Sequence, residues 1–139
     1  QDMEILQQRG YETIDLVVVN LYPFKETIAQ DCTFDEAIEK IDIGGPTMIR
    51  SAAKNFKDVA VVSNPSDYSR LIEEWENGDG ISYDFRKELS QKVFETMADY
   101  NLSISNYLKE ESGNSIPNYS FEKSSSLRYG QSIKSSINF

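Results

Sequence analysis

Two short runs of apolar, mostly β-branched residues constrain the fold of this chain more than any other feature. They cover residues 14–19 (IDLVVV) and residues 59–62 (VAVV), and segments with helical patterns separate them. Continuous apolar runs of this length are typical of strands that are buried on both faces of a parallel sheet. Because strands alternate with helices, the pattern predicts an α/β protein, a three-layer sandwich in which helices cover a parallel sheet.

Most of the remaining sequence has helical patterns. Thr33 and Glu36 form a capping box, which predicts that a short helix begins directly after Thr33. Pro46 is expected at the first position of another helix, where its missing N–H has little cost. We expect helices over residues 1–9, 34–40, 46–55, 65–76 and 84–110, the last as one long helix or as two in tandem. Two strands are too few for a stable sheet, so we expect N-terminal strands to be missing from this sequence.

Charge and reactive residues exclude several classes of function. The net charge is −9, from 14 Lys and Arg against 23 Asp and Glu, so nucleic acid is not an expected partner. Cys32 is the single cysteine and histidine is absent, which leaves no Cys/His metal site and no Ser-His or Cys-His nucleophile pair. No run approaches the roughly 18 apolar residues of a membrane-spanning helix. We therefore expect a cytoplasmic protein without a membrane partner.

The aromatic residues of the two C-terminal helical patterns recur at helical spacing. This spacing is typical of the buried face of a helix. We expect five of them in the core: Tyr68, Trp75, Phe85, Phe94 and Tyr107.

The turn Gly44–Gly45–Pro46 is the most informative local feature. Two residues without side chains let a ligand approach the backbone where a helix start leaves N–H groups unpaired, which favours an anion or an oxyanion. Asp42 and Tyr22 strengthen this interpretation, because ligands of open α/β sheets bind beyond the carboxyl ends of the strands. The alternatives stay open: a turn that only connects two elements, a helix-flanking charge at Asp42, and a buried ring at Tyr22.

Arg50 and Lys54 place two cations on one face of the helix that follows this turn. They could contact a substrate, or they could only balance nearby carboxylates. Lys54 lies eight residues after Pro46, about 12 Å along a helix axis. Spacing alone does not decide whether its amine reaches Asp42.

Two longer strings of the sequence closely resemble a known family. They are residues 14–24 (IDLVVVNLYPF) and residues 41–55 (IDIGGPTMIRSAAKN). The family is that of bifunctional purine biosynthesis proteins, which couple a phosphoribosylaminoimidazolecarboxamide formyltransferase to an IMP cyclohydrolase. The resemblance covers residues 1 to about 110 and implies the C-terminal part of a cyclohydrolase domain with a methylglyoxal-synthase-like fold.

The family resemblance implies a reaction and a set of site residues. In the reaction, the carboxamide nitrogen of a formylated aminoimidazole nucleotide attacks the formyl carbon and water is lost, which yields IMP. The implied catalytic residues are Tyr22, Asp42 and Lys54. The implied substrate contacts are Asn20, Leu21, Ile43, Gly44, Gly45 and Arg50, with the amides of Ile43 and Gly44 near the developing oxyanion. Ring closure in the family needs no metal or cofactor, and the resemblance implies a homodimer.

The C-terminal region differs in composition from the body. We divide the chain into residues 1–111, the cyclohydrolase part, and residues 112–139, a serine-rich linker. Within the linker, residues 127–130 (LRYG) resemble the start of the family's formyltransferase domain, which implies substrate contacts by Arg128 and Tyr129. That domain uses 10-formyltetrahydrofolate in the family.

The sequence also departs from the family pattern. The family's earlier segments, which include its phosphate-binding loop and a further catalytic lysine, are absent, and so is nearly all of the formyltransferase domain. We therefore expect this stretch alone to lack substantial turnover. The alternative function is a non-catalytic module that binds a nucleotide or a phosphate, or that mediates an interaction.

Overall fold

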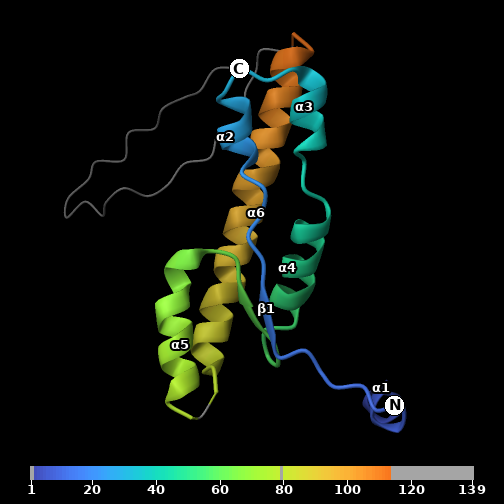
Figure 1. Ribbon diagram of the computed structural model, residues 1–139, viewed down its shortest axis with the longest axis vertical. Helices are drawn as coiled ribbons and strands as arrows, with labels where there is room; N and C mark the ends of the chain where they lie inside the picture. Colours follow the sequence, from blue (N-terminus) through green and yellow to red (C-terminus); the bar gives the residue numbers. More distant parts are fainter. Residues whose placement is uncertain (1, 79, 114–139) are drawn as a thin grey trace, which may run out of the picture.

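The computed structural model describes residues 2–78 and 80–113 of the chain (Figure 1). One long helix, α6 (Tyr83–Glu111), runs along the described part, and helix α1 (Asp2–Gln8) lies apart from the other elements (Figure 1). In chain order the elements are α1 (Asp2–Gln8), β1 (Leu16–Val18), α2 (Phe24–Ile28), α3 (Phe34–Glu39), α4 (Gly44–Lys54), β2 (Ala60–Val62), the 3₁₀ turn η1 (Pro65–Asp67), α5 (Tyr68–Glu76) and α6 (Tyr83–Glu111).

The two predicted strands pair in parallel, which confirms the α/β fold class with a small parallel sheet. Leu16 lies opposite Ala60, and Val18 lies opposite Val62. The connection between the strands contains α2, α3 and α4, as a parallel pair requires. All three residues of β2 are buried, because β2 packs against both α4 and α6. The prediction that the first strand is buried on both faces was wrong. The main neighbours of β1 are β2 and α4, and Val18 stays 45% exposed.

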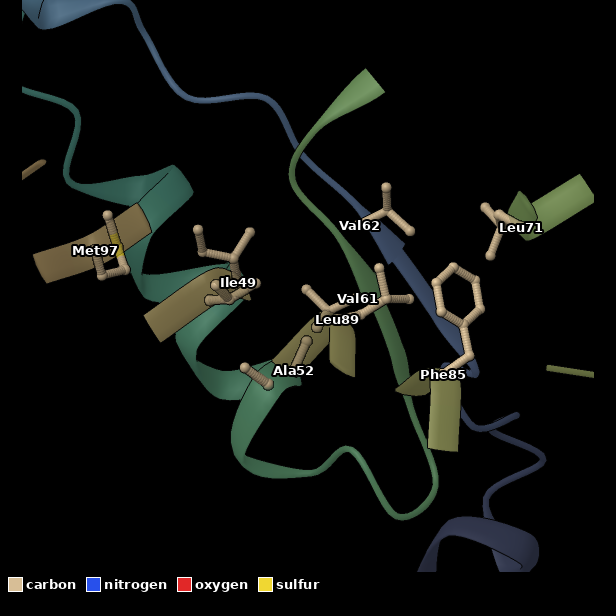
Figure 2. Close-up of a cluster of buried hydrophobic side chains, with 10 residues drawn as sticks. Ile49, Ala52, Val61, Val62, Leu71, Phe85, Leu89 and Met97 are labelled. Atoms are coloured by element: carbon tan, nitrogen blue, oxygen red, sulfur yellow. The ribbon is translucent and has the colours of Figure 1, made fainter. Parts of the chain in front are cut away.

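The hydrophobic core lies where β2 meets α4, α5 and α6 (Figure 2). Helix α4 contributes Ile49 and two alanines, and the small alanines allow α6 to approach closely. The predicted helix over 84–110 is confirmed as the single helix α6, whose N-cap Ser82 accepts a hydrogen bond from the Phe85 N–H at 3.3 Å. The core residues are Ile49, Ala52, Ala53, Val61, Val62, Leu71, Phe85, Leu89, Val93 and Met97.

The aromatic prediction for the core holds only in part. Phe85 is fully buried, but Trp75 is 57% exposed and Phe94 is 43% exposed, so both were wrongly placed in the core. Leu71 faces the core from α5, whereas Trp75 lies beside Leu16 and Ile72 along a shallow groove. Phe94 lies beneath the guanidinium of Arg50, which is 5.8 Å from the ring centroid. Helical spacing indicated the right elements but made the buried stripe too wide.

One helix start differs from the sequence prediction, and another confirms it. Helix α4 begins at Gly44, so Pro46 is its third residue and not its first. The capping box at α3 is confirmed: the Thr33 hydroxyl accepts the Glu36 N–H at 3.3 Å, and the Glu36 carboxylate accepts the Thr33 N–H at 2.8 Å. Hydrogen bonds from the Thr33 backbone and side chain lower the pKa of the Glu36 carboxyl.

Within residues 2–78 and 80–113, no helix is both long enough and apolar enough to cross a membrane. The predicted linker, residues 112–139, lies almost entirely outside the described residues.

Candidate functional site

The loop that follows β1 and the turn that precedes α4 meet at the side chain of Asp42. Its Oδ1 accepts a hydrogen bond from the Gly45 N–H at 2.9 Å, and its Oδ2 accepts a longer one from the Tyr22 N–H at 3.4 Å. A carboxylate that accepts the N–H groups of a first helical turn stabilises the helix start. Asp42 therefore connects two segments that the sequence analysis selected separately.

Close contact with Asp42 and Leu21 explains why a glycine occupies position 45. Gly45 is buried, and a Cβ atom there would lie 2.5 Å from Asp42 Oδ2 and 2.8 Å from Leu21 Cδ2. At Gly44 a Cβ atom would meet no atom within 4 Å. Both glycines have helical backbone geometry with negative φ, so space and not conformation requires Gly45.

The Asp42 loop is also held from α6. The Tyr100 hydroxyl accepts a hydrogen bond from the Asp42 N–H at 2.7 Å, and the Tyr100 ring packs edge-on against Phe24 with 6.2 Å between ring centroids. Phe24 is 1% exposed and begins α2, directly after the Tyr22–Pro23 segment. Burial, and to a lesser extent the nearby Asp42 carboxylate, raises the pKa of the Tyr100 phenol. The hydroxyl is therefore protonated at neutral pH.

The other residues near Asp42 leave an open surface. The Tyr22 side chain is 60% exposed and that of Ile43 is 72% exposed. Gly44 is exposed as well, and its N–H is among the first of α4, which have no acceptor within the helix. Asn20 is exposed, and its Oδ1 accepts a 3.4 Å hydrogen bond from the Tyr68 hydroxyl. Five predicted substrate contacts therefore lie near Asp42. Asn20 and Leu21 lie in the loop after β1, directly before Tyr22, and Ile43, Gly44 and Gly45 directly follow Asp42 in the chain.

The two predicted cationic residues lie away from this turn. Lys54 is the last residue of α4, ten residues after Gly44, which corresponds to about 15 Å along the helix axis. Its side chain is exposed, and within the described residues no contact joins it to Asp42. Arg50 is exposed on the same helix, with its guanidinium over the Phe94 ring. The structure thus joins Asp42 to the backbone of Tyr22, and it places Lys54 at the far end of α4.

The remaining candidate groups from the sequence are the Arg128–Tyr129 pair, Cys32 and any metal-binding cluster. Arg128 and Tyr129 lie outside the described residues. Cys32 is half-buried with a free thiol. Within the described part of the chain, no cluster of three or more His, Cys, Asp and Glu side chains could hold a metal ion.

An apolar groove lies along α4, apart from Asp42. It has a volume of about 500 Å³, and its lining consists of Ile14, Val17, Thr47, Met48, Ser51, Ala52, Asn55 and Val59. None of the predicted site residues lines it. We place the candidate site at Asp42 and not in this groove, because the groove lining offers hydroxyl and amide groups but no carboxylate or other charged side chain that could move a proton.

The sequence analysis missed Tyr100 and Phe24 as supports of the Asp42 loop. Tyr100 follows Val93 and Met97 at helical spacing, and these two residues face the core. That spacing indicates that Tyr100 points toward α4, but its hydrogen bond to a residue 58 positions away leaves no local signal in the sequence.

Comparison with protein families identifies the relatives of the chain. The profile of the AICARFT/IMPCHase bienzyme family matches residues 52–136, and the profile of the MGS-like domain matches residues 1–47. The second match agrees with the observed α/β arrangement and confirms the methylglyoxal-synthase-like fold.

Individual relatives agree with these profiles. The chain is 50% identical over 131 residues to the bifunctional purine biosynthesis protein PurH of Clostridium kluyveri, and 47% identical over the same length to that of Fusobacterium nucleatum. Each alignment covers 94% of this chain and 26% of the relative, so the chain spans about a quarter of the length of these proteins. The crystal structure of ForH matches 75% of this chain and 55% of its own, at 34% identity and a TM-score of 0.59. The chain therefore belongs to the AICARFT/IMPCHase bienzyme family.

Proposed function

We propose that this chain carries part of an IMP cyclohydrolase site, and that its role is in purine biosynthesis. The surface around Asp42 binds the purine nucleotide, with the heterocycle next to residues 20–22 and 42–45. The observation that supports this most directly is the pair of hydrogen bonds from Gly45 and Tyr22 to one carboxylate. They bring a carboxylate, a phenol-bearing segment and a helix start to one surface beyond the carboxyl end of β1, where ligands of α/β proteins bind.

The chemistry of this surface suits ring closure. The reaction removes a proton from a weakly acidic amide nitrogen and releases the former formyl oxygen as water. The Asp42 carboxylate acts as the proton acceptor, while the exposed Tyr22 phenol and the first N–H groups of α4 stabilise the oxygen that becomes negative. Each of these roles falls to a group of this chain. A homodimer, and the use of 10-formyltetrahydrofolate by a formyltransferase domain, stay proposals that rest on the family resemblance.

Titration of IMP into the purified chain tests the proposal, with the heat of binding as the measurement. We expect the unsubstituted chain to bind IMP and Asp42→Ala to weaken the affinity by about tenfold or more, because the carboxylate supports both segments of the surface. Lys57→Ala is the control, since this exposed lysine follows α4 at the end away from Asp42. Absence of IMP binding by the unsubstituted chain contradicts the proposal.

The position of Lys54 favours a second candidate, a module that binds a nucleotide without converting it. A catalytic pair needs its groups at the same reacting atoms, and Lys54 lies at the opposite end of α4 from Asp42. Because this stretch alone is expected to lack substantial turnover, the assay of IMP formation from the formylated nucleotide uses this chain joined to the preceding part of the family's cyclohydrolase domain, and it separates the two functions. A cyclohydrolase loses turnover in Asp42→Ala and in Lys54→Ala while Lys54→Ala still binds IMP. A module binds IMP with no turnover in any variant.

A further inference from the structure

The side chain of Tyr100, on α6, forms a hydrogen bond with the Asp42 loop. Its hydroxyl accepts the Asp42 N–H at 2.7 Å, so a residue in the middle of a long helix fixes the backbone of the loop. Tyr100 is half-buried, and Asp42 is half-buried as well. A short hydrogen bond in a partly desolvated place restrains its partners more than one in open solvent.

The restraint on the backbone extends to the carboxylate. The Asp42 side chain is short, so the position of its backbone decides whether Oδ1 reaches the Gly45 N–H and Oδ2 faces the Tyr22 N–H. The carboxylate occupies the space beside Gly45 that a Cβ atom would fill. Movement of the Asp42 amide away from Tyr100 would therefore displace both carboxylate oxygens.

Tyr100 itself is held in place by Phe24. The two rings pack edge-on at 69° with 6.2 Å between centroids, and Phe24 is 1% exposed. Because Phe24 begins α2 directly after the Tyr22–Pro23 segment, Tyr100 contacts both segments of the candidate site, one through its ring and one through its hydroxyl.

We propose that Tyr100 is a positioning residue for the Asp42 carboxylate and that it acts through the Asp42 amide; this proposal rests on the proposed function. Tyr100 does not contact the reacting atoms. Its hydroxyl sets the distance between the carboxylate and the helix start, and its ring keeps the Tyr22 segment beside them.

Amide hydrogen exchange in the Tyr100→Phe variant, followed by NMR, tests the positioning step. The substitution removes the hydroxyl and keeps the ring. We expect exchange at Asp42, which loses its acceptor, to rise by about five- to tenfold. We expect a similar rise at Gly45, whose N–H bonds to the Asp42 carboxylate and not to Tyr100. In an Asp42→Ala background the Gly45 N–H has already lost its acceptor, so Tyr100→Phe should add nothing there.

Tyr107→Phe is the matched control. Tyr107 lies two turns further along α6, and its ring packs against the same Phe24 with 5.8 Å between centroids. This variant should leave exchange at Asp42 and Gly45 unchanged. The Ala60 amide at the start of the buried strand β2 donates to the Asp15 carbonyl at 2.8 Å and reports global opening in every variant. A rise at Ala60 equal to that at Gly45 would mean general destabilisation and would overturn the proposal.

The functional consequence is measured by IMP titration of the same variants. Tyr100→Phe should weaken IMP affinity by about three- to tenfold, and Tyr107→Phe should not. Unchanged affinity in Tyr100→Phe, with wild-type binding intact, overturns the positioning role alone. Absence of IMP binding by the unsubstituted chain overturns the proposed function, and the exchange at Gly45 still decides whether the hydroxyl sets the position of the carboxylate.

Discussion

The two ends of α4 are both held by α6, but by different chemistry. At the C-terminal end, Arg86 donates to the carbonyl oxygens of Phe56 and Lys57 at 3.0 and 2.8 Å. The buried Ser90 hydroxyl donates to the Ala53 carbonyl at 2.8 Å. Arg86 also donates to the carbonyl of Ile81, in the segment before α6. At the N-terminal end, Tyr100 accepts one N–H from the Asp42 loop. The first end contains several donors for several carbonyls, whereas the second contains one acceptor for one amide.

This difference indicates that the two ends of α4 have different roles, one in the stability of the fold and the other in binding. At the C-terminal end, the carbonyls of Ala53, Phe56 and Lys57 accept hydrogen bonds from side chains of α6, so these three groups are already paired within the described chain. The N-terminal end keeps exposed groups at Tyr22, Ile43 and Gly44. We infer that the C-terminal end of α4 stabilises the fold and that the N-terminal end carries the function, and four substitutions or titrations test this division.

Arg86→Met should have the largest effect. It removes hydrogen bonds to three carbonyl groups and keeps an apolar side chain of similar length, so we expect a loss of about 2–3 kcal/mol in the free energy of unfolding. Urea denaturation followed by circular dichroism measures it. Arg86→Lys is the control, and it should recover only part of the loss because an ammonium lacks the planar fork of donors. A loss below that of Ser90→Ala would break the comparison.

Gly45→Ala should act mainly on binding. The added Cβ would lie 2.5 Å from Asp42 Oδ2, so the carboxylate must move, at a cost of about 1–3 kcal/mol and with reduced IMP affinity. Gly44→Ala is the matched variant, since its Cβ meets no atom within 4 Å, and it should leave stability unchanged or raise it by up to about 1 kcal/mol. Equal effects of the two substitutions in denaturation and titration would contradict the packing argument.

Ser90→Ala should lower stability without altering binding. The buried Ala53 carbonyl loses one of its donors, which costs about 1 kcal/mol. IMP affinity should stay within the error of the titration, because Ser90 lies at the end of α4 away from Asp42. An affinity change comparable to that of Tyr100→Phe would show that the two ends are coupled.

Alkaline titration should have the smallest effect and should act on the N-terminal end. The pKa of Tyr100 is raised in the folded state, so its contribution to stability is complete below the ordinary tyrosine value of 10.0 and is lost as the pH rises through the higher folded value. Burial also raises the pKa of Tyr107, so tyrosinate absorbance should show two late-titrating groups, of which Tyr100→Phe removes one and Tyr107→Phe the other. Persistence of both groups in Tyr100→Phe would contradict the assignment to Tyr100.

Local patterns predicted the elements of this fold better than their burial. The capping box at Thr33 and the parallel strands were correct because each depends on neighbouring residues or on apolar runs. The exposure of Trp75 and Phe94 was missed because it depends on which other helices cover α5 and α6, which helical spacing does not specify.

The candidate site shows the same limit. Gly45 and Asp42 lie three residues apart, so their contact could be predicted from a turn pattern together with the family resemblance. The support from Tyr100 and from Arg86 joins residues 29 to 58 positions apart and needs the packing of α6 against α4. Lys54 stays a predicted catalytic residue. The turnover assay decides whether it acts in catalysis although it lies at the opposite end of α4 from Asp42.

The attachment of both ends of α4 to one straight helix limits which insertions and deletions this chain can accept. One residue added within Gly44–Lys54 would rotate everything beyond it by about 100° and lengthen the helix by about 1.5 Å, so Ala53 and Asp42 could not both keep their α6 partners. Length variation should therefore be confined to the loops before Asp42 and after Lys57, and a chain altered inside this helix would lose either its stability or its binding surface.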